Sequence, residues 1–158
     1  MAQKSHFPVV ALEDVPAAVP TNSSNKRRPV VLVVDDESAI ADTLSEILSL
    51  SGYAAMPAYD AEEALETALL MPPELLITDV MLPGMSGIEL AISIRRIFPD
   101  CKVLLFSGQA ATSDLLTKAQ TAGHHFTLLN KPVYPTDLLR RVSESLDLAQ
   151  GALAARPF

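Results

Sequence analysis

Short apolar runs alternate with amphipathic segments between residues 30 and 150. Each run has the length of a strand and keeps apolar side chains at consecutive positions, as strands buried on both faces of a parallel sheet do. The five runs are VVLVV (30–34), YAAMPA (53–58), ELLIT (74–78), KVLLFS (102–107) and FTLLN (126–130). The pattern predicts five strands, of which the second is the most weakly marked.

Each run is followed by a segment whose apolar residues recur every three or four positions, which predicts a helix with one buried face. Residues that favour helix starts precede several of these segments. They are Asp60 with Glu63, Ser86 with Glu89, and Pro135. Residues that end helices follow the segments. They are Gly52, the pair Pro72-Pro73, Gly123 and Gly151.

Five strand–helix units predict an α/β fold, in which helices cover both faces of a parallel sheet and the crossovers are right-handed. We expect this folded domain to span residues 30–150. Residues 1–29 contain four prolines and the polar run TNSSN, without a helix or strand period, which predicts a flexible N-terminal arm. Residues 151–158 are expected to form a C-terminal tail.

Hydrophobic residues make up 49% of the chain and charged residues 20%, as in an ordinary globular protein. No apolar run is long enough to span a membrane, and FPVVAL (7–12) is too short for the core of a signal peptide. We therefore expect a cytoplasmic protein. The single cysteine, Cys101, agrees with this location because it cannot form an internal disulfide. It directly precedes a predicted strand, so we expect a buried or half-buried, unreactive thiol.

The net charge of −7 is unevenly distributed. Residues 1–29 carry more basic than acidic side chains, so the remainder from Val30 onward is strongly acidic. An acidic domain argues against nucleic acid as its partner. The basic run NKRRP (25–29) is typical of a solvated linker.

Polar side chains follow four of the five predicted strands. They are Asp35, Asp36 and Glu37 after the first strand, Asp79 after the third, Ser107 at the end of the fourth, and Lys131 after the fifth. Each one alone is compatible with an ordinary structural role, such as a helix cap, a turn residue or a solvated strand end. Because the carboxyl ends of parallel strands meet at one edge of a sheet, we expect all of them to face one pocket.

The charges indicate what such a pocket holds. Two carboxylates about 4 Å apart repel by roughly 4 kcal/mol at an effective dielectric constant near 20. Lys131 relieves part of this repulsion, and a divalent cation relieves more. Oxygen ligands favour a hard ion, and one that pairs with phosphate is typically Mg²⁺. Asp79 could then attack phosphorus and carry the phosphoryl group as an acyl phosphate, with Ser107 and Lys131 hydrogen-bonded to its oxygens.

The motifs VLVVDDE, LLITDVMLPGMSGIEL, VLLFSG and NKPV occur in this order and with compatible spacing. In these motifs residues 30–150 resemble a response-regulator receiver domain, the phosphoacceptor module of two-component signalling. The resemblance implies a flavodoxin-like fold of five βα units with strand order 2-1-3-4-5, and Mg²⁺ as cofactor. It implies that the phosphoryl group comes from a histidine kinase or a histidine phosphotransfer protein. It also implies that the domain is not an enzyme, beyond promoting its own phosphorylation and dephosphorylation.

The same resemblance assigns roles to individual residues. It makes Asp79 the phosphorylation site and Asp36 a direct Mg²⁺ ligand. Asp35 would support the metal mainly through water, and the backbone carbonyl of Met81 would be the remaining protein ligand. Ser107 would supply the hydroxyl that moves onto the phosphoryl group, and Lys131 would be the cationic partner of that group. In the family the peptide bond corresponding to Lys131-Pro132 is usually cis.

Two features depart from the family pattern. Receivers usually carry Tyr or Phe three residues before the lysine, where rotation of the ring reports phosphorylation. Here that residue is Leu128, and Phe126, on the same face of the strand, is a candidate substitute. Met81 and Gln109 occupy positions that tune hydrolysis of the acyl phosphate in the family. Because the apolar side chain of Met81 cannot position water, we expect a long-lived phosphorylated state.

The three histidines are expected to be structural or solvated. His124 and His125 are adjacent, and adjacent side chains of an extended chain point in opposite directions, which is poor geometry for chelating one metal. His6 stands alone in the N-terminal arm. None of them resembles a phosphohistidine site. The residues expected to pack or to line the rim are Tyr53, Tyr59 and Tyr134.

A DNA-binding output domain would need about 60 or more further residues, so we expect a stand-alone receiver. Its partners would be the phosphodonor and a downstream protein that docks on the face made by the fourth helix, the fifth strand and the fifth helix. Relay of the phosphoryl group to another protein is an alternative output. Homodimerisation through the same face is compatible with the sequence.

Three other functions fit the sequence less well. An aspartate-nucleophile phosphatase of the haloacid-dehalogenase type would place a second acid two residues after the nucleophile, where this chain has Met81. A flavodoxin-like cofactor binder would place a glycine- or hydroxyl-rich phosphate cradle after the first strand, where this chain has three acids. A receiver fold that docks partners without phosphorylation is disfavoured because Asp79, Ser107 and Lys131 are all present beside the acid pair.

Overall fold

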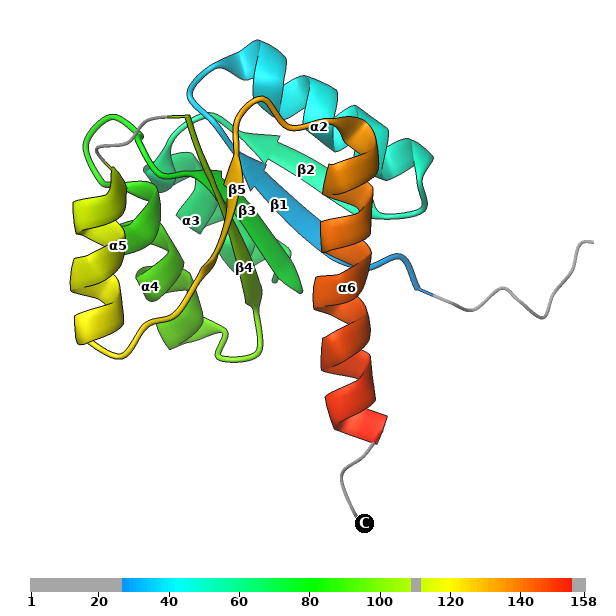
Figure 1. Cartoon of the computed structure of the whole chain (residues 1–158). Helices are drawn as coiled ribbons and strands as arrows, with labels where there is room; N and C mark the ends of the chain where they lie inside the picture. The colour runs from blue at the N-terminus through cyan, green and yellow to red at the C-terminus, as the bar shows by residue number, and fades with distance from the viewer. Residues whose placement is uncertain (1–26, 109–111, 155–158) are drawn as a thin grey trace, which may run out of the picture.

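The computed structural model describes residues 27–108 and 112–154, in which five strands alternate with five helices (Figure 1). The strands are β1 (Val30–Val34), β2 (Ala54–Ala58), β3 (Leu75–Asp79), β4 (Lys102–Ser107) and β5 (Thr127–Asn130). The helices are α2 (Ser38–Leu50), α3 (Ala61–Leu70), α4 (Gly87–Ile97), α5 (Thr112–Thr121) and α6 (Pro135–Ala154). The element order predicted from the apolar periodicity is confirmed, with strand bounds that differ by at most one residue.

The strands form a five-stranded parallel sheet in the order β2-β1-β3-β4-β5. This confirms both the predicted α/β class and the strand order that the family resemblance implied. β3 lies at the centre of the sheet and is buried along its whole length, which explains why its sequence is a continuous apolar run. The central strand therefore carries Asp79 to the carboxyl edge of the sheet.

Helices cover both faces of the sheet (Figure 1). On one face α3, α4 and α5 surround a core that includes Leu76 and Leu90. On the other face α2 and α6 surround a core that includes Ile77 and Leu138. Leu76 and Ile77 are consecutive residues of β3 and are fully buried in opposite layers, as the two-residue period of a strand requires.

The predicted caps fix where two helices begin. The Asp60 side chain accepts a hydrogen bond from the backbone N–H of Glu63 at 2.7 Å, at the start of α3. The Ser86 hydroxyl accepts one from the backbone N–H of Glu89 at 3.1 Å, at the start of α4. Gly52 follows α2 with a φ of 102°, a left-handed conformation that glycine adopts without strain.

The predicted end of the last helix is wrong, because α6 continues through Gly151 to Ala154. A glycine inside a helix costs only about 1 kcal/mol relative to alanine, so glycine alone does not stop a helix. At the other end, the carbonyl of Pro29 accepts a hydrogen bond from the backbone N–H of Ala54 at 2.8 Å, which joins the start of the described chain to β2. Most of the predicted arm, residues 1–26, and the end of the tail, residues 155–158, lie outside the described residues.

Candidate functional site

The sheet brings the polar strand ends together as the sequence predicts. Asp35 follows β1 directly, and its backbone N–H donates to the carbonyl of Ala58 at the end of β2, at 3.1 Å. Asp79 ends β3 and pairs in register with Phe106 of β4, so that Ser107 is the next residue along the neighbouring strand. Ser107 in turn accepts a backbone hydrogen bond from Lys131 at 3.0 Å.

Lys131 connects two carboxylates that come from different strands. Its ammonium nitrogen Nζ lies 2.8 Å from Oδ2 of Asp79 and 3.0 Å from Oδ2 of Asp35. Burial lowers the pKa of the Lys131 ammonium, but hydrogen bonds and charge attraction to Asp79 and Asp35 outweigh it and raise the pKa above its usual value. The lysine is therefore held in its charged form at neutral pH.

The second oxygen of each carboxylate is also engaged. Oδ1 of Asp35 accepts a hydrogen bond from the backbone N–H of Glu37 at 2.9 Å, and Oδ1 of Asp79 accepts one from the backbone N–H of Met81 at 3.0 Å. Contacts at both oxygens fix the orientation of the two side chains. The main chain at Met81 thus lies beside the Asp79 carboxylate, while the Met81 side chain is 49% exposed.

Three carboxylates lie close enough to share a cation. One carboxylate oxygen from each of Asp35, Asp36 and Asp79 lies within 4.8 Å of the other two. Asp35 is fully buried and Asp79 is 9% exposed, whereas Asp36 faces solvent. One ammonium group cannot balance three carboxylates, and an all-oxygen donor set with an open side matches the preference of Mg²⁺. The residues present therefore fit the magnesium ion that the sequence implied.

A close backbone contact between Gly87 and the main chain at Val80 and Asp79 was not evident from the sequence. Gly87, the first residue of α4, donates its backbone N–H to the carbonyl of Val80 at 2.8 Å. A Cβ atom at Gly87 would lie only 1.9 Å from the carbonyl oxygen of Asp79. The same carbonyl accepts a hydrogen bond from the Thr78 hydroxyl at 3.0 Å. The sequence signals this contact only by a glycine directly after the capping residue Ser86, and that pattern is too common at helix starts to predict it.

A groove opens beside the site, between the beginning of α2 and the connection from β5 to α6. Its volume is roughly 680 Å³. Its lining is mainly apolar, and Lys131 supplies its charge. The lining residues are Ala39, Ile40, Thr43, Leu44, Phe106, Gly108, Lys131, Pro132 and Val133. The groove borders the acidic cluster through Lys131, which contacts both Asp79 and Asp35.

A model of the response regulator receiver domain matches residues 31–143. The chain belongs to the response-regulator receiver family. Response regulator MprA of Mycobacterium ulcerans is 31% identical over 112 residues, which make up 71% of this chain and 47% of that protein. MprA of Mycobacterium tuberculosis H37Rv is 30% identical over a stretch of the same length, 48% of that protein. The chain thus spans about half the length of the curated relatives it matches.

Solved structures agree with the family. A CheY-like receiver domain protein from Methanospirillum hungatei has a TM-score of 0.73 and 31% identity, and the match covers 80% of this chain and 99% of that one. The chemotaxis protein CheY4 of Vibrio cholerae has a TM-score of 0.68 and 26% identity, with 75% and 99% covered. Membership of this family favours signalling over the phosphatase and the flavodoxin-like cofactor binder. In the part of the chain that the structure describes, no helix is long and apolar enough to cross a membrane.

The receiver domain has the cis peptide bond between Lys131 and Pro132 that the resemblance implied. Leu128, where receivers usually have an aromatic ring, is half-buried and packs with Phe126 against the core under α3, α4 and α5. This confirms that the two side chains share a face. Whether Phe126 replaces the missing ring stays a prediction, and Gln109 lies outside the described residues.

The Phe126 ring lies beside a guanidinium group and an imidazole ring. The guanidinium carbon of Arg95, on α4, lies 4.8 Å from the centre of the Phe126 ring. The His124 ring is parallel to that of Phe126 within 3°, with 6.2 Å between their centres. His124 is therefore a packing residue, as expected, and His125 is exposed. His6 falls outside the described residues.

None of the hydrogen bonds and ion pairs described for Asp35 and Asp79 involves a tyrosine. Tyr53 packs against the core under α2 and α6. Tyr59 donates its hydroxyl hydrogen to Oδ1 of Asp42 at 2.5 Å, and Tyr134 is 62% exposed. These positions match the packing and rim roles expected from the sequence.

Proposed function

We propose that this receiver domain accepts a phosphoryl group on Asp79 from a phosphohistidine of a histidine kinase or a histidine phosphotransfer protein. The observation that carries the proposal is the Lys131 ammonium, 2.8 Å from Asp79, beside a second buried carboxylate and an exposed third one. This arrangement presents the Asp79 carboxylate as a nucleophile, and it places a cation next to the oxygens that would receive negative charge.

In the transfer, a carboxylate oxygen of Asp79 attacks the phosphorus atom. A P–O bond forms while the P–N bond to the donor imidazole breaks, and the imidazole keeps the electron pair and takes up a proton. Bound Mg²⁺ would neutralise charge on the phosphoryl oxygens. Asp36 would ligate it directly, Asp35 mainly through water, and Met81 through its backbone carbonyl. Asp79 needs no separate general base because it is already a carboxylate.

After transfer, negative charge moves from the Asp79 carboxylate onto the phosphoryl oxygens. Lys131, which contacts Asp79 now, would then donate to one of these oxygens and lose part of its attraction to the carboxylate. Ser107 is 5% exposed and directly follows the strand partner of Asp79, which supports a role for its hydroxyl as the donor to a second phosphoryl oxygen. The signal would thus begin as a rearrangement at the ends of β4 and β5.

The output would be a protein–protein contact. The face made by α5, β5 and α6 adjoins Ser107 and Lys131 and is the surface we expect to respond, by binding a downstream protein or a second copy of the domain. Relay of the phosphoryl group to a phosphotransfer protein is the other output that the chemistry permits. A cytoplasmic location and the lack of a further enzymatic activity stay predictions from the sequence.

The test is phosphorylation in a defined mixture. The protein is incubated with Mg²⁺ and acetyl phosphate, and intact mass is measured beside Asp79→Asn and the control Asp100→Asn, which changes an exposed carboxylate outside the cluster. We expect one phosphoryl group on the wild type and on Asp100→Asn and none on Asp79→Asn. No gain in any of them, with Mg²⁺ binding demonstrated, would replace the proposal with a docking module that works without phosphorylation.

A further inference from the structure

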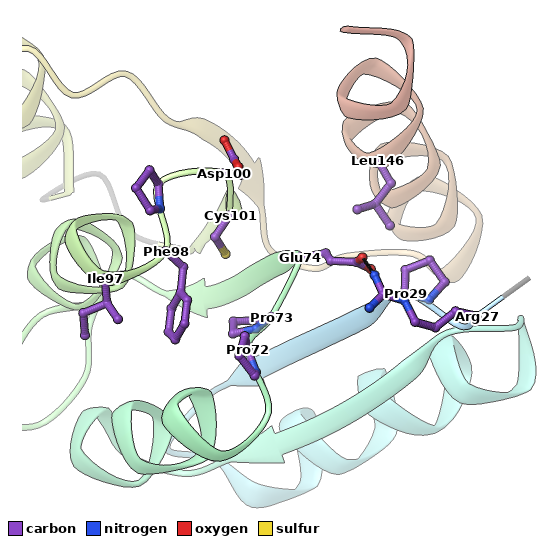
Figure 2. A pocket seen from close by; sticks show the side chains of 11 residues that line it. Arg27, Pro29, Pro72, Pro73, Glu74, Ile97, Phe98, Asp100, Cys101 and Leu146 are labelled. Carbon is purple, nitrogen blue, oxygen red and sulfur yellow. Dashed lines mark hydrogen bonds and ion pairs between the residues drawn. The ribbon is translucent and has the colours of Figure 1, made fainter. Parts of the chain in front are cut away.

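A second groove lies at the opposite end of the sheet from Asp79. It is formed by the residues that lead into β1, β3 and β4, together with α6, and its volume is roughly 650 Å³. Figure 2 shows Phe98 on one side of this amino-end groove, Leu146 and Pro29 on the other, and Pro72 and Pro73 between them. Its walls are therefore mainly proline, aliphatic and aromatic side chains.

Large apolar side chains stand exposed at this end of the molecule. Ile97, which lines the groove, is 47% exposed. Leu70 and Met71 are 88% and 45% exposed and directly precede Pro72, another lining residue. Exposed apolar side chains next to an apolar groove mark a surface that buries something else.

The chain itself enters the fold at the rim of this groove. Arg27, the first described residue, lines the groove and forms an ion pair with Glu74. The other carboxylate oxygen of Glu74 accepts a hydrogen bond from the backbone N–H of Val30 at 3.1 Å. These contacts anchor the start of the described chain at the groove, so the segment before Arg27 is tethered at this rim.

We propose that FPVVAL (7–12) of this chain occupies the amino-end groove. This hexapeptide has an aromatic residue, a proline and branched aliphatic side chains, which suit walls of proline, Phe98 and Ile97. Residues 13–26 can span up to ~45 Å when extended, which is enough for the segment to turn back into the groove. Because the segment is tethered at the rim, its effective concentration there is high.

The segment is uncharged, as an apolar groove requires. FPVVAL contains no ionisable side chain, and two of the charged lining residues, Arg27 and Glu74, already pair with each other. The groove lies at the amino ends of the strands, whereas Asp79 and Lys131 lie at the carboxyl ends. The contact would leave the acidic site open, and it does not depend on the phosphoacceptor function.

The test uses tryptophan fluorescence of the full chain, which contains no natural tryptophan. In Phe7→Trp we expect the tryptophan to emit at shorter wavelength than free tryptophan. We also expect its fluorescence to be protected from quenching by acrylamide. Ile97→Asp, made in the Phe7→Trp background, should shift the emission to longer wavelength and remove the protection, because it places a charge in the groove. Ile97→Ser is the milder variant if circular dichroism shows that Ile97→Asp does not fold.

The matched control is Leu50→Asp, also in the Phe7→Trp background. Leu50 is 82% exposed on α2 and does not line the groove, so this change should leave the emission as it is. Emission like that of free tryptophan in Phe7→Trp would overturn the proposal, as would a blue shift that Ile97→Asp does not alter. A blue shift that disappears on dilution would also overturn it, because the occupant would then be the segment of a second copy.

Discussion

Nζ of Lys131 lies 2.8 Å from Oδ2 of Asp79, although 52 residues separate them in the chain. The same nitrogen lies 3.0 Å from Oδ2 of Asp35, which is 96 residues away. One cation thus ties the ends of β1, β3 and β5 together. Without the lysine, the carboxylates of Asp35 and Asp79 would repel each other. The same repulsion favours binding of a further cation at this site.

Replacing Lys131 by Met should destabilise the protein when no divalent cation is present. Removing one partner of a fully buried charge pair costs about 3–5 kcal/mol, and we expect roughly 1–3 kcal/mol here because the Lys131 side chain is 23% exposed. Urea unfolding in EDTA measures this. Added Mg²⁺ should stabilise Lys131→Met more than the wild type, and an equal gain in both would argue against a shared cation site. Lys118→Met, on an exposed part of α5, serves as the control.

Stability should also depend on alkaline pH through Lys131. The folded state raises its pKa above the ordinary value of 10.5, so the contribution is fully present below pH 10.5 and is lost as the pH rises through the higher folded pKa. The difference in unfolding free energy between the wild type and Lys131→Met should be constant from neutral pH to about pH 9 and shrink above 10.5. Tyrosines also titrate there, but they are common to both proteins. If the difference in unfolding free energy did not shrink as the pH rose above 10.5, the stabilising role assigned to the Lys131 ammonium would be wrong.

Gly87→Ala should destabilise the domain and weaken phosphorylation of Asp79. The new Cβ would meet the carbonyl oxygen of Asp79 at 1.9 Å, and such a backbone clash is relieved only by moving the site. Overpacking typically costs about 1–3 kcal/mol, and the upper part of that range is expected. Gly108→Ala is the matched control, because its nearest contact would be an ordinary 3.5 Å to Lys131. Gly87→Ala should unfold at a lower temperature and take up less phosphoryl group than Gly108→Ala.

Met81→Asn should shorten the lifetime of the phosphorylated state. Met81 is 49% exposed beside Asp79 and offers no hydrogen bond from its side chain to an attacking water. An amide could orient that water, and we expect hydrolysis to become faster by about tenfold, equivalent to ~1.4 kcal/mol of activation free energy. Decay of the phosphorylated mass after removal of acetyl phosphate measures the rate. Met81→Leu should decay like the wild type, and equal decay in Met81→Asn would count against the role of Met81.

Cys101 should resist thiol reagents while the protein is folded. It is 3% exposed, and burial raises the pKa of its thiol to about 12, which confirms the expectation of a buried thiol. At pH 8 a group with that pKa is thiolate in roughly one molecule in 10⁴. Reaction with a chromogenic disulfide should therefore be very slow in buffer and complete in urea. Cys101 also lines the amino-end groove, and stoichiometric labelling of the folded protein within minutes would show that this groove opens around the thiol.

The sequence predicted the elements and the edge of the sheet that carries the site, because both depend on local patterns. Continuous apolar runs predicted five strands, and capping residues such as Asp60 and Ser86 predicted where two helices begin. A parallel sheet then places the ends of all strands at one edge, so Asp35, Asp79 and Lys131 were expected together from the sequence alone. The local signal failed at Gly151, where the small cost of a helical glycine was overcome.

Only the tertiary structure decided which atoms meet. Lys131 bridges two carboxylates, and Gly87 approaches the carbonyl of Asp79. Both contacts join different elements of the fold. The pairing of the strands and the packing of α4 on the sheet set the distances between these elements. The amino-end groove likewise exists because the chain before β1, β3 and β4 lies beside α6. Periodicity along a chain reports which side of an element is buried, and it carries no information about the separation between elements distant in sequence.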